Sequence, residues 1–407
     1  MKRKESKIKF VGLHGHTTIG SPGDAIGYPD EHMDFAWENG MDALATTDHG
    51  TMNALSYQVL HAKKMAEEGK EFKPIFGVEA YFINSVDNWK DLYEETKKNK
   101  TKIKKSDEKA ELIENEEETK GRTKFNPLNE RSHLVLLAQN EVGLKNLFQV
   151  VSKSYGDDNF YRYPRVDFDL LKEHNEGIIV STACLGSYLM KPVWEAGEDF
   201  NDTIVFEQIL SRAEEFKSIF GDRFFLELQW NAIKQQHVLN KYLVRASKEL
   251  NTPLISTADS HYPRPDLWKD RILYKKLAWL SKGGGENSLP GTIEEVGYEL
   301  YPKNGDQMWD SYKDYSKVFN IEYDDDLILE SIERTHDIAF DMIGDFTPDT
   351  SIKLPSFVVP EGKTPDRALA EFCIEGLRTK GLHKNKEYID RLKFELNVIG
   401  DRDFSKY

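Results

Sequence analysis

The sequence predicts an α/β fold with a mainly parallel sheet. Short apolar runs alternate with amphipathic stretches over the first 265 residues, as strands and helices do in proteins of this class. About seven such units occur, which favours a closed barrel over an open sheet, although periodicity alone does not decide between them. Ionisable side chains also follow several of the apolar runs, and in a parallel barrel such residues gather where the strands end.

The predicted strands are short apolar runs bounded by polar residues or glycine. They cover residues 8–13, 43–46, 74–81, 133–138, 177–181, 224–229 and 253–256.

The predicted helices carry apolar residues three and four positions apart. They cover residues 28–39, 54–68, 142–154, 203–220 and 235–250, with further helices around 326–341 and 367–380. The acidic run of Asp324, Asp325 and Asp326 is interpreted as a solvated turn that starts a helix.

Two segments interrupt the alternation. Residues 86–131 are dense in Lys and Glu, which predicts a solvated insertion that is partly helical or partly disordered. A glycine-rich stretch at 283–291 marks a loop near a domain boundary. We therefore expect one domain over residues 1–282 and a second region over residues 283–407.

The composition excludes several classes of protein. The net charge of −15 argues against a broad basic surface for duplex DNA, although carboxylates that hold metals still allow phosphate to bind. No run of 18 apolar residues occurs, so no membrane helix is expected. Two cysteines, Cys184 and Cys373, cannot form a disulfide framework, and without a secretory signal they favour a reducing, cytoplasmic location.

Metal-competent side chains gather at the ends of the apolar runs. Four runs are followed by such groups, as His14 and His16, Asp48 and His49, Cys184, and Asp259 and His261. Glu79 lies inside another run, and His133 departs from the pattern because it opens its run. Since the ends of parallel strands converge on one rim of a barrel, we expect these side chains to lie close together.

Spacing supports a shared site. His14 and His16 are one residue apart, as are Asp259 and His261, so each pair faces one way in extended chain, and Gly15 leaves room beside the ions. These ligand types suit zinc or manganese-like ions, and about two or three of them would activate water and stabilise a phosphoryl transition state. Taken singly, each residue also fits a polar network or the core, but the joint pattern favours metal binding.

Six short motifs occur in a fixed order. They are LHGHT at 13–17, TDHG at 47–50, GVEAY at 77–81, SHLVLLA at 132–138, STACL at 181–185 and ADSHY at 258–262. Together they resemble the PHP (polymerase and histidinol phosphatase) domain, in the version at the N-terminus of the bacterial-type (C-family) DNA polymerase III alpha subunit. Residues 299–301, 353–357, 360–362 and 391–399 are similar to the segment that leads into the palm of that polymerase, so the resemblance covers nearly the whole chain.

The resemblance implies a distorted seven-stranded (βα) barrel of the PHP type, a metal-dependent phosphoesterase domain, over residues 1–282. An incomplete, mainly helical segment that leads to the palm would follow over residues 283–407. The implied metal ligands are His14, His16, Asp24, His49, Glu79, His133, Cys184, Asp259 and His261.

The resemblance also implies how these ligands divide among two or three divalent ions, whether Zn, Mn or Fe. His14, His16, Glu79 and Asp259 would hold one ion, and these four are also the implied catalytic residues. Glu79 would bridge to a second ion, held with His133 and Cys184. A third would be held by Asp24, His49 and His261.

The intact ligand set favours activity, and intact relatives imply a metal-dependent 3′–5′ exonuclease that proofreads the 3′ end of the primer strand during DNA replication. The acidic palm cluster that binds magnesium for polymerisation does not occur in the sequence. DNA polymerisation would therefore need Mg and a C-terminal part with palm, fingers and thumb, which would also carry any contact with a sliding clamp. A truncated chain, a phage-encoded or split polymerase, and an intein-joined one all fit.

Two other functions stay open. The barrel could be a structural module that stabilises the polymerase, or a stand-alone phosphatase for a small phosphoester. The intact ligands argue against the first, and the polymerase-like tail argues against the second.

Overall fold

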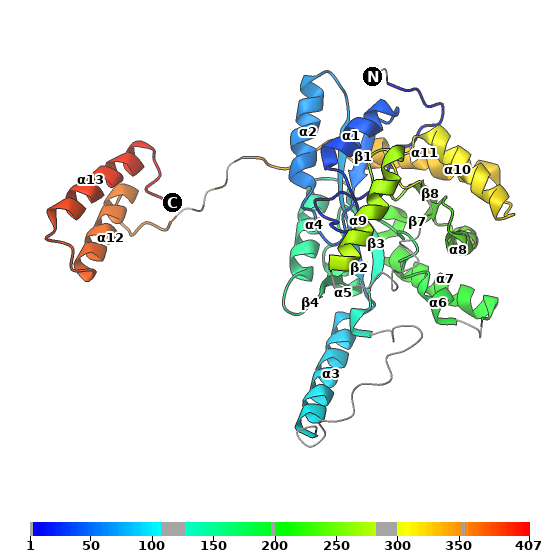
Figure 1. Cartoon of the computed structure of the whole chain (residues 1–407), viewed down its shortest axis with the longest axis horizontal. Helices are drawn as coiled ribbons and strands as arrows, with labels where there is room; N and C mark the ends of the chain where they lie inside the picture. Colours follow the sequence, from blue (N-terminus) through cyan, green and yellow to red (C-terminus); the bar gives the residue numbers. More distant parts are fainter. Residues whose placement is uncertain are drawn as a thin grey trace. The chain divides into compact units, whose positions relative to one another are not determined.

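The computed structural model describes residues 3–106, 127–196, 200–281, 299–351, 353, 355 and 357–407. The chain forms two compact units, Met1–Pro348 and Asp349–Tyr407 (Figure 1). The predicted boundary between residues 282 and 283 lies outside the described residues. Among the described residues, none of the helices combines the length and the hydrophobicity of a membrane-spanning segment.

The first unit is built on an eight-stranded sheet in the order β4-β5-β2-β3-β6-β7-β8, with β1 beside β2. The strands are β1 (Ala43–Thr46), β2 (Lys73–Phe82), β3 (Ser132–Ala138), β4 (Phe160–Tyr161), β5 (Tyr163–Val166), β6 (Ile178–Ser181), β7 (Phe224–Gln229) and β8 (Leu254–Thr257). The pairs β1–β2, β2–β5, β6–β7 and β7–β8 are parallel, whereas β3 runs antiparallel to both β2 and β6. The β4–β5 pair was not predicted.

Residues 12–16 close the curved sheet into a ring. Gly12 bridges Leu44 of β1, and Gly15 bridges Ser260 just beyond β8. Together with β1, β2, β3, β6, β7 and β8, this segment completes the distorted seven-stranded barrel that the sequence predicts.

The prediction of a strand over residues 8–13 was wrong in its extent. This segment is joined to its neighbour by an isolated bridge at Gly12 and is not a continuous strand. Its side chains still follow the alternation of a strand, because Val11 and Leu13 pack inside the barrel.

The inward faces of the strands change character along the barrel. One end is filled by an apolar cluster, here called the floor, of Val11, Leu13, Ala43, Ala45, Ile75, Val135, Leu137, Ile179, Phe225 and Ile255. Residues two apart in a strand share a face, so Glu227 and Thr257 follow Phe225 and Ile255 on the inside of the barrel. The floor therefore leads into a polar opposite end, here called the mouth.

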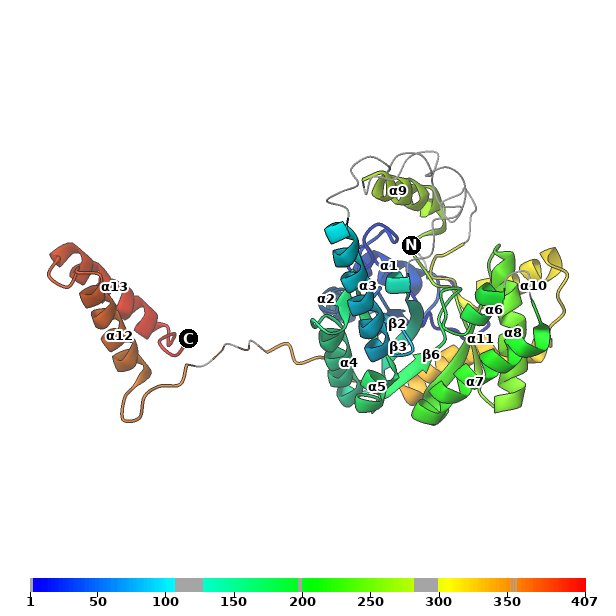
Figure 2. The same ribbon diagram turned by 90° about the horizontal axis from the view of Figure 1, so that it is seen from below.

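Helices cover the outside of the ring, and Figure 2 shows α2, α4 and α5 on one side of the strands and α7, α8, α10 and α11 on the other. The helices are α1 (Pro29–Glu38), α2 (Leu55–Glu67), α3 (Val86–Ser106), α4 (Glu141–Ser154), α5 (Phe168–Glu173), α6 (Lys191–Ala196), α7 (Asp202–Phe220), α8 (Lys234–Leu250), α9 (Trp268–Ser281), α10 (Gly305–Val318) and α11 (Asp325–Asp337), which continues as a π-helical turn at Ile338–Met342. A second apolar cluster joins strands to helices, for example Phe76 and Leu136 to Leu147 and Phe216. The helices predicted in this unit correspond to α1, α2, α4, α7, α8 and α11.

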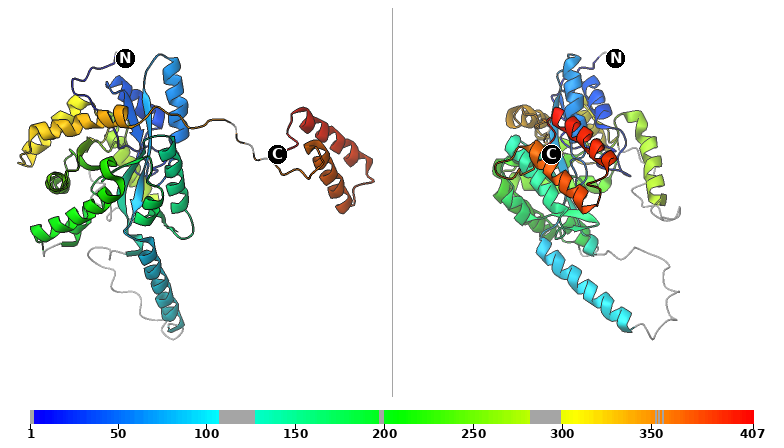
Figure 3. Two further views of the ribbon diagram at one scale, coloured as in Figure 1. Left: turned by 180° about the vertical axis from the view of Figure 1, so that it is seen from behind. Right: turned by 90° about the vertical axis from the view of Figure 1, so that its left-hand side faces the viewer.

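The charged insertion is helical in its first part. Helix α3 projects from the barrel, as Figure 3 shows, and is anchored by an apolar cluster of Ile83, Val86, Trp89 and Leu128. The rest of the predicted insertion, residues 107–126, lies outside the described residues, as does the glycine-rich stretch at 283–291.

Two further helix starts follow the capping chemistry of their sequences. Asp324 accepts hydrogen bonds from the backbone amides of Asp326 and Leu327, so the acidic run starts α11 as predicted. In the second unit, Thr364 caps α12 (Pro365–Thr379), which packs with α13 (Lys386–Asp401).

Candidate metal centre

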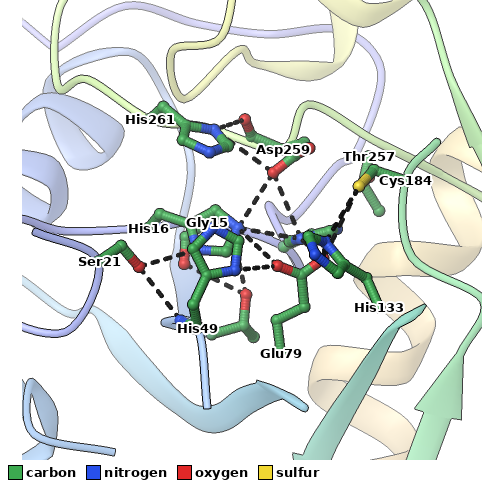
Figure 4. A network of polar contacts seen from close by, with 12 residues as sticks. Gly15, His16, Ser21, His49, Glu79, His133, Cys184, Thr257, Asp259 and His261 are labelled. Carbon is green, nitrogen blue, oxygen red and sulfur yellow. Dashed lines mark hydrogen bonds and ion pairs between the residues drawn. The ribbon is translucent and has the colours of Figure 1, made fainter. Parts of the chain in front are cut away.

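The strand ends bring all nine predicted ligand residues together at the mouth of the barrel, as Figure 4 shows for most of them. His49, Cys184 and Asp259 closely follow β1, β6 and β8, and Glu79 lies within β2. The cluster comprises His14, His16, Asp24, His49, Glu79, His133, Cys184, Asp259 and His261.

The antiparallel direction of β3 explains the position of His133. This histidine lies at the start of its strand, whereas His49, Cys184 and Asp259 follow theirs. Because β3 runs against β2 and β6, its first residues lie at the same end of the barrel as the last residues of its neighbours. His133 pairs with Tyr81 near the end of β2, and its side chain reaches the mouth.

Glu79 lies at the centre of the cluster. Its Oε1 atom is 3.0 Å from His133 Nδ1 and 3.4 Å from His14 Nε2, and its Oε2 atom is 2.5 Å from His49 Nδ1. Cys184 Sγ lies 3.8 Å from Oε1 and 3.5 Å from His133 Nδ1. One carboxylate thus contacts both sides of the cluster, which is the placement a bridging ligand requires.

Asp259 joins the two histidines of the first motif. Its Oδ1 atom lies 3.3 Å from His14 Nε2 and 3.1 Å from His16 Nε2. His261 Nδ1 lies 2.8 Å from the Asp259 carbonyl oxygen. A hydrogen bond donated by Nδ1 fixes the tautomer that leaves the Nε2 lone pair of His261 facing Asp24.

Asp24 divides its two carboxylate oxygens between histidines and cations. Its Oδ2 atom lies 3.3 Å from the Nε2 atoms of both His49 and His261. Its Oδ1 atom lies 2.8 Å from Arg271 Nη2 and 2.9 Å from Lys275 Nζ, both on α9. The two cations therefore orient the carboxylate and turn one oxygen toward the histidines.

The donor atoms fit a group of divalent cations. Within the cluster, three buried atoms have no hydrogen-bond partner among the described residues, namely His49 Nδ1, Glu79 Oε2 and Asp259 Oδ1. His49 Nδ1 and Glu79 Oε2 are close but not in hydrogen-bond geometry. Leaving a buried polar atom unpaired costs about 1–3 kcal/mol, and a cation would remove that cost.

Three overlapping groups of donor atoms are compact enough to hold an ion, with all atoms of a group within 4.8 Å of one another, and His16 and His49 each belong to two of these groups. They are His16–His49–His261, His14–His16–Asp259 and His49–Glu79–His133. Imidazole, carboxylate and thiol donors suit zinc, manganese or iron.

Burial and charged neighbours shift the pKa values of the histidines in the cluster in opposite directions. Burial, helped by the positive charge of His49, lowers the pKa of His16 to about 3. Burial also acts to lower the pKa of His49, but the carboxylates of Glu79 and Asp24 outweigh it and raise that pKa to about 10. Burial and the charge of Glu79 raise the pKa of the Cys184 thiol well above its ordinary value, so a cation is needed to form the thiolate.

Glu227 belongs to the site but was missed by the sequence analysis. It is fully buried in β7 and accepts hydrogen bonds from His14 Nδ1 at 2.6 Å, Ser181 Oγ at 2.5 Å and Thr257 Oγ1 at 2.6 Å. By holding the Nδ1 proton it directs His14 Nε2 into the cluster. The available signal was a glutamate inside an apolar run, the same signal that singled out Glu79.

Asp48 is metal-competent but supports the centre from outside. Its carboxylate accepts hydrogen bonds from the Thr17 amide at 2.7 Å and from Ser21 Oγ at 2.8 Å. Ser21 Oγ in turn lies 3.2 Å from His16 Nδ1. Asp48 therefore orients His16 through Ser21.

Strained backbone lies at or next to two of the candidate ligands. Asp259, with φ 49°, and Ala183, with φ 58° directly before Cys184, are in the left-handed region, which costs about 1–2 kcal/mol for a non-glycine residue. Such strain persists only where the surroundings enforce it, which is common at functional sites. A Cβ atom on Gly15 would lie 2.5 Å from Ser260 Oγ, so this glycine makes room for Ser260.

These features define the first unit as an α/β barrel with a candidate multi-ion centre at its mouth. A family model described as the PHP domain matches residues 12–231, more than half of the chain. The chain therefore belongs to the PHP domain family.

The relatives of the chain are larger proteins. It is 32% identical over 403 residues to the DNA polymerase III subunit alpha of Aquifex aeolicus and 28% identical over 402 residues to that of Borreliella burgdorferi. Both matches cover 98% of this chain and 30% of the relative, so the chain spans less than a third of their length and corresponds to their N-terminal region. Among solved structures, an amidohydrolase from Chromobacterium violaceum covers 65% of this chain and 96% of its own, with a TM-score of 0.33 and 12% identity.

Proposed function

We propose that the PHP domain of this chain is a metal-dependent phosphodiesterase that removes nucleotides from the 3′ end of DNA. The observation that supports this proposal is a cluster of nine metal-competent side chains with Glu79 at its centre, three of which have a buried atom without a hydrogen-bond partner. The polymerase relatives supply the substrate class, because a hydrolytic centre in a replicative polymerase would act on the primer strand.

The chain's own residues would hold and orient the ions. His14, His16, Glu79 and Asp259 would hold the ion of the reacting phosphate, with Glu79 shared with His133 and Cys184. His16, with a pKa of about 3, is neutral at pH 7 and offers a lone pair without first losing a proton. When bound, divalent ions supply the positive charge that polarises a phosphodiester.

The remaining ligands would complete the centre. Asp24, His49 and His261 would hold a third ion, with Arg271 and Lys275 keeping Asp24 in place. Glu227 and Asp48 would fix the orientations of His14 and His16. Zn, Mn and Fe all suit these donors.

We further infer that the domain works as part of a larger polymerase. Residues 1–282 would form the PHP domain and residues 283–407 the start of the region leading to the palm. DNA polymerisation would require a C-terminal part that binds Mg and, through it, any sliding clamp.

The test is a cleavage assay on a primer–template with a mismatched 3′ end and a label at the 5′ end of the primer. With manganese or zinc, the chain should shorten the primer from its 3′ end, and a His14→Ala, His16→Ala double variant should not. His61→Ala is the matched control, because His61 pairs with Asp34 on the outer helices and should leave cleavage unchanged.

Two outcomes would replace the proposal. A metal-loaded chain that cleaves no substrate would indicate a structural module. Hydrolysis of a small aryl phosphate without any cleavage of DNA would indicate a phosphatase.

A further inference from the structure

Three side chains beside the His133 side of the centre have no part in the proposed chemistry. They are Tyr81, Arg131 and Tyr163, here called the arginine–tyrosine cluster. The Arg131 guanidinium lies 3.9 Å from the ring centre of Tyr163 and 5.6 Å from that of Tyr81, and the two rings lie 5.3 Å apart, edge to face.

Strand geometry places this cluster on the same surface as the metal ligands. Tyr81 lies two residues after Glu79 in β2, and Arg131 lies two residues before His133 at the start of β3. Residues two apart in extended chain share a face, and Tyr81 pairs directly with His133. The cluster is therefore the next layer of the barrel interior beyond the ligands, toward solvent.

The cluster touches the centre directly. The Tyr81 ring stacks on the His49 ring with 5.9 Å between centres and 15° between planes, and it lies 5.7 Å from the His133 ring. A Cβ atom on Gly50 would lie 3.2 Å from the Tyr81 ring, so the backbone there packs closely against the tyrosine. A ligand that reaches the ions from this side must pass the cluster.

Arg131 is well placed to receive an anion. It is exposed, and no described carboxylate lies within ion-pairing distance of it, whereas Arg271 and Lys275 on the other side of the centre are already paired with Asp24. Stacking on Tyr163 holds the guanidinium plane in position at low entropic cost. Its fork of N–H groups matches the oxygens of a phosphate.

We propose that Arg131, oriented by Tyr163 and Tyr81, binds a backbone phosphate of single-stranded DNA next to the bond being cleaved. This inference rests on the proposed function and adds that the substrate is an oligonucleotide that extends beyond its terminal phosphodiester. A small phosphoester would have no phosphate at this position. Arg131 is thus a substrate-binding residue that contributes to KM. It is not one of the candidate metal ligands.

The test compares two substrates and several variants at saturating manganese. For a single-stranded oligonucleotide, Arg131→Ala should raise KM about tenfold, because a charge-assisted contact is lost. The slope of log KM against log salt should fall by about 0.7, the change expected for one phosphate contact on a single strand. Hydrolysis of bis(p-nitrophenyl) phosphate, metal content and melting temperature should not change.

Companion variants separate binding from structure. Arg131→Lys should recover part of the affinity, because it keeps the charge and loses the fork. Tyr163→Phe keeps the aromatic ring on which Arg131 stacks, so it should behave as wild type. Tyr163→Leu loses that ring, so it should resemble Arg131→Ala. Arg245→Ala is the matched control, because Arg245 stacks on Phe206 at the same 3.9 Å on the outer helix layer.

The inference is overturned if wild type cleaves the oligonucleotide and Arg131→Ala has the same KM and salt slope. A wild type that cleaves nothing would instead refute the proposed function. In that case, fluorescence anisotropy with a labelled phosphorothioate oligonucleotide decides the inference: equal affinity of wild type and Arg131→Ala overturns it, and about tenfold weaker binding of the variant supports it.

Discussion

The floor and the mouth of the barrel are built by the same strands, but the floor contains apolar side chains and the mouth contains ionisable ones. In the floor, Ile75, Phe225 and Ile255 pack against one another without polar atoms. Two to four residues further along, Glu79 and Glu227 are buried just as completely. The change from apolar to ionisable takes place within single strands.

The floor makes it possible for the folded chain to hold so many ionisable groups together. Burying unpaired charge is costly, so the mouth does not stabilise the barrel by itself. The floor supplies apolar burial and a rigid register from which alternate side chains project. We therefore expect variants in the mouth to change metal binding, and variants in the floor to change stability.

The largest effect should follow loss of a ligand at the centre of the mouth. Glu79→Gln should lower the rate of phosphodiester cleavage at least about 1000-fold, since it removes charge from a carboxylate that contacts both sides of the cluster. Cleavage kinetics together with circular dichroism provide the measurement. A folded Glu79→Gln variant with near-normal cleavage would show that this carboxylate does not hold the reacting ion.

The floor should give the opposite behaviour. Ile255→Ala should lower the free energy of unfolding by about 2–5 kcal/mol through lost burial and a cavity, while metal content per folded chain stays the same. Urea unfolding and metal analysis of one sample test both halves. Ile255→Val is the milder control, with an expected loss of about 0.5–1.5 kcal/mol.

Glu227 lies between the two regions and should show an intermediate effect. Glu227→Gln keeps the shape but weakens the contact that orients His14, so metal affinity should fall about 10–100-fold. Metal titration with a competing chelator measures this. Unchanged affinity would mean that His14 does not depend on Glu227 for its orientation.

The smallest effect should be the pH dependence of metal affinity. The pH dependence of stability should differ between the metal-free and the metal-bound protein. The pKa of His49 is raised from 6.5 to about 10, so a bound ion must displace its proton. Metal affinity should therefore rise about tenfold per pH unit for each proton displaced. Calorimetric titrations from pH 6.5 to pH 9 test this, and affinity that falls with pH would contradict it.

The same pKa shift acts in the other direction on the metal-free protein. A histidine with a raised pKa contributes stability that is complete below pH 6.5 and is lost as the pH rises toward 10. The metal-free barrel should therefore lose stability over the pH range in which metal binding strengthens. Thermal unfolding with and without chelator distinguishes the two trends.

Much of this arrangement could be predicted from the sequence, because strand alternation and strand ends are local properties. The positions of Glu79 and Cys184 relative to their apolar runs indicated one shared rim. His133 fitted this pattern only once β3 was seen to be antiparallel, and strand direction is not encoded in a short apolar run.

Other features depend on contacts between distant segments. Arg131 and Tyr163 meet because β5 pairs with the end of β2, and the β4–β5 pair has no strong sequence pattern. Arg271 reaches Asp24 through the packing of α9, which alternation along the strands does not specify. Glu227 differs from these, since its position inside an apolar run was visible in the sequence.

The metal content of the purified chain decides whether the mouth of the barrel is a metal centre. Inductively coupled plasma mass spectrometry, with protein quantified by amino-acid analysis, gives the number of ions per chain after gentle purification. We expect two or three divalent ions per chain, and a loss of at least one of them in the His14→Ala, His16→Ala variant. A folded wild-type chain that retains essentially none, and takes up none from manganese or zinc solution, would contradict it.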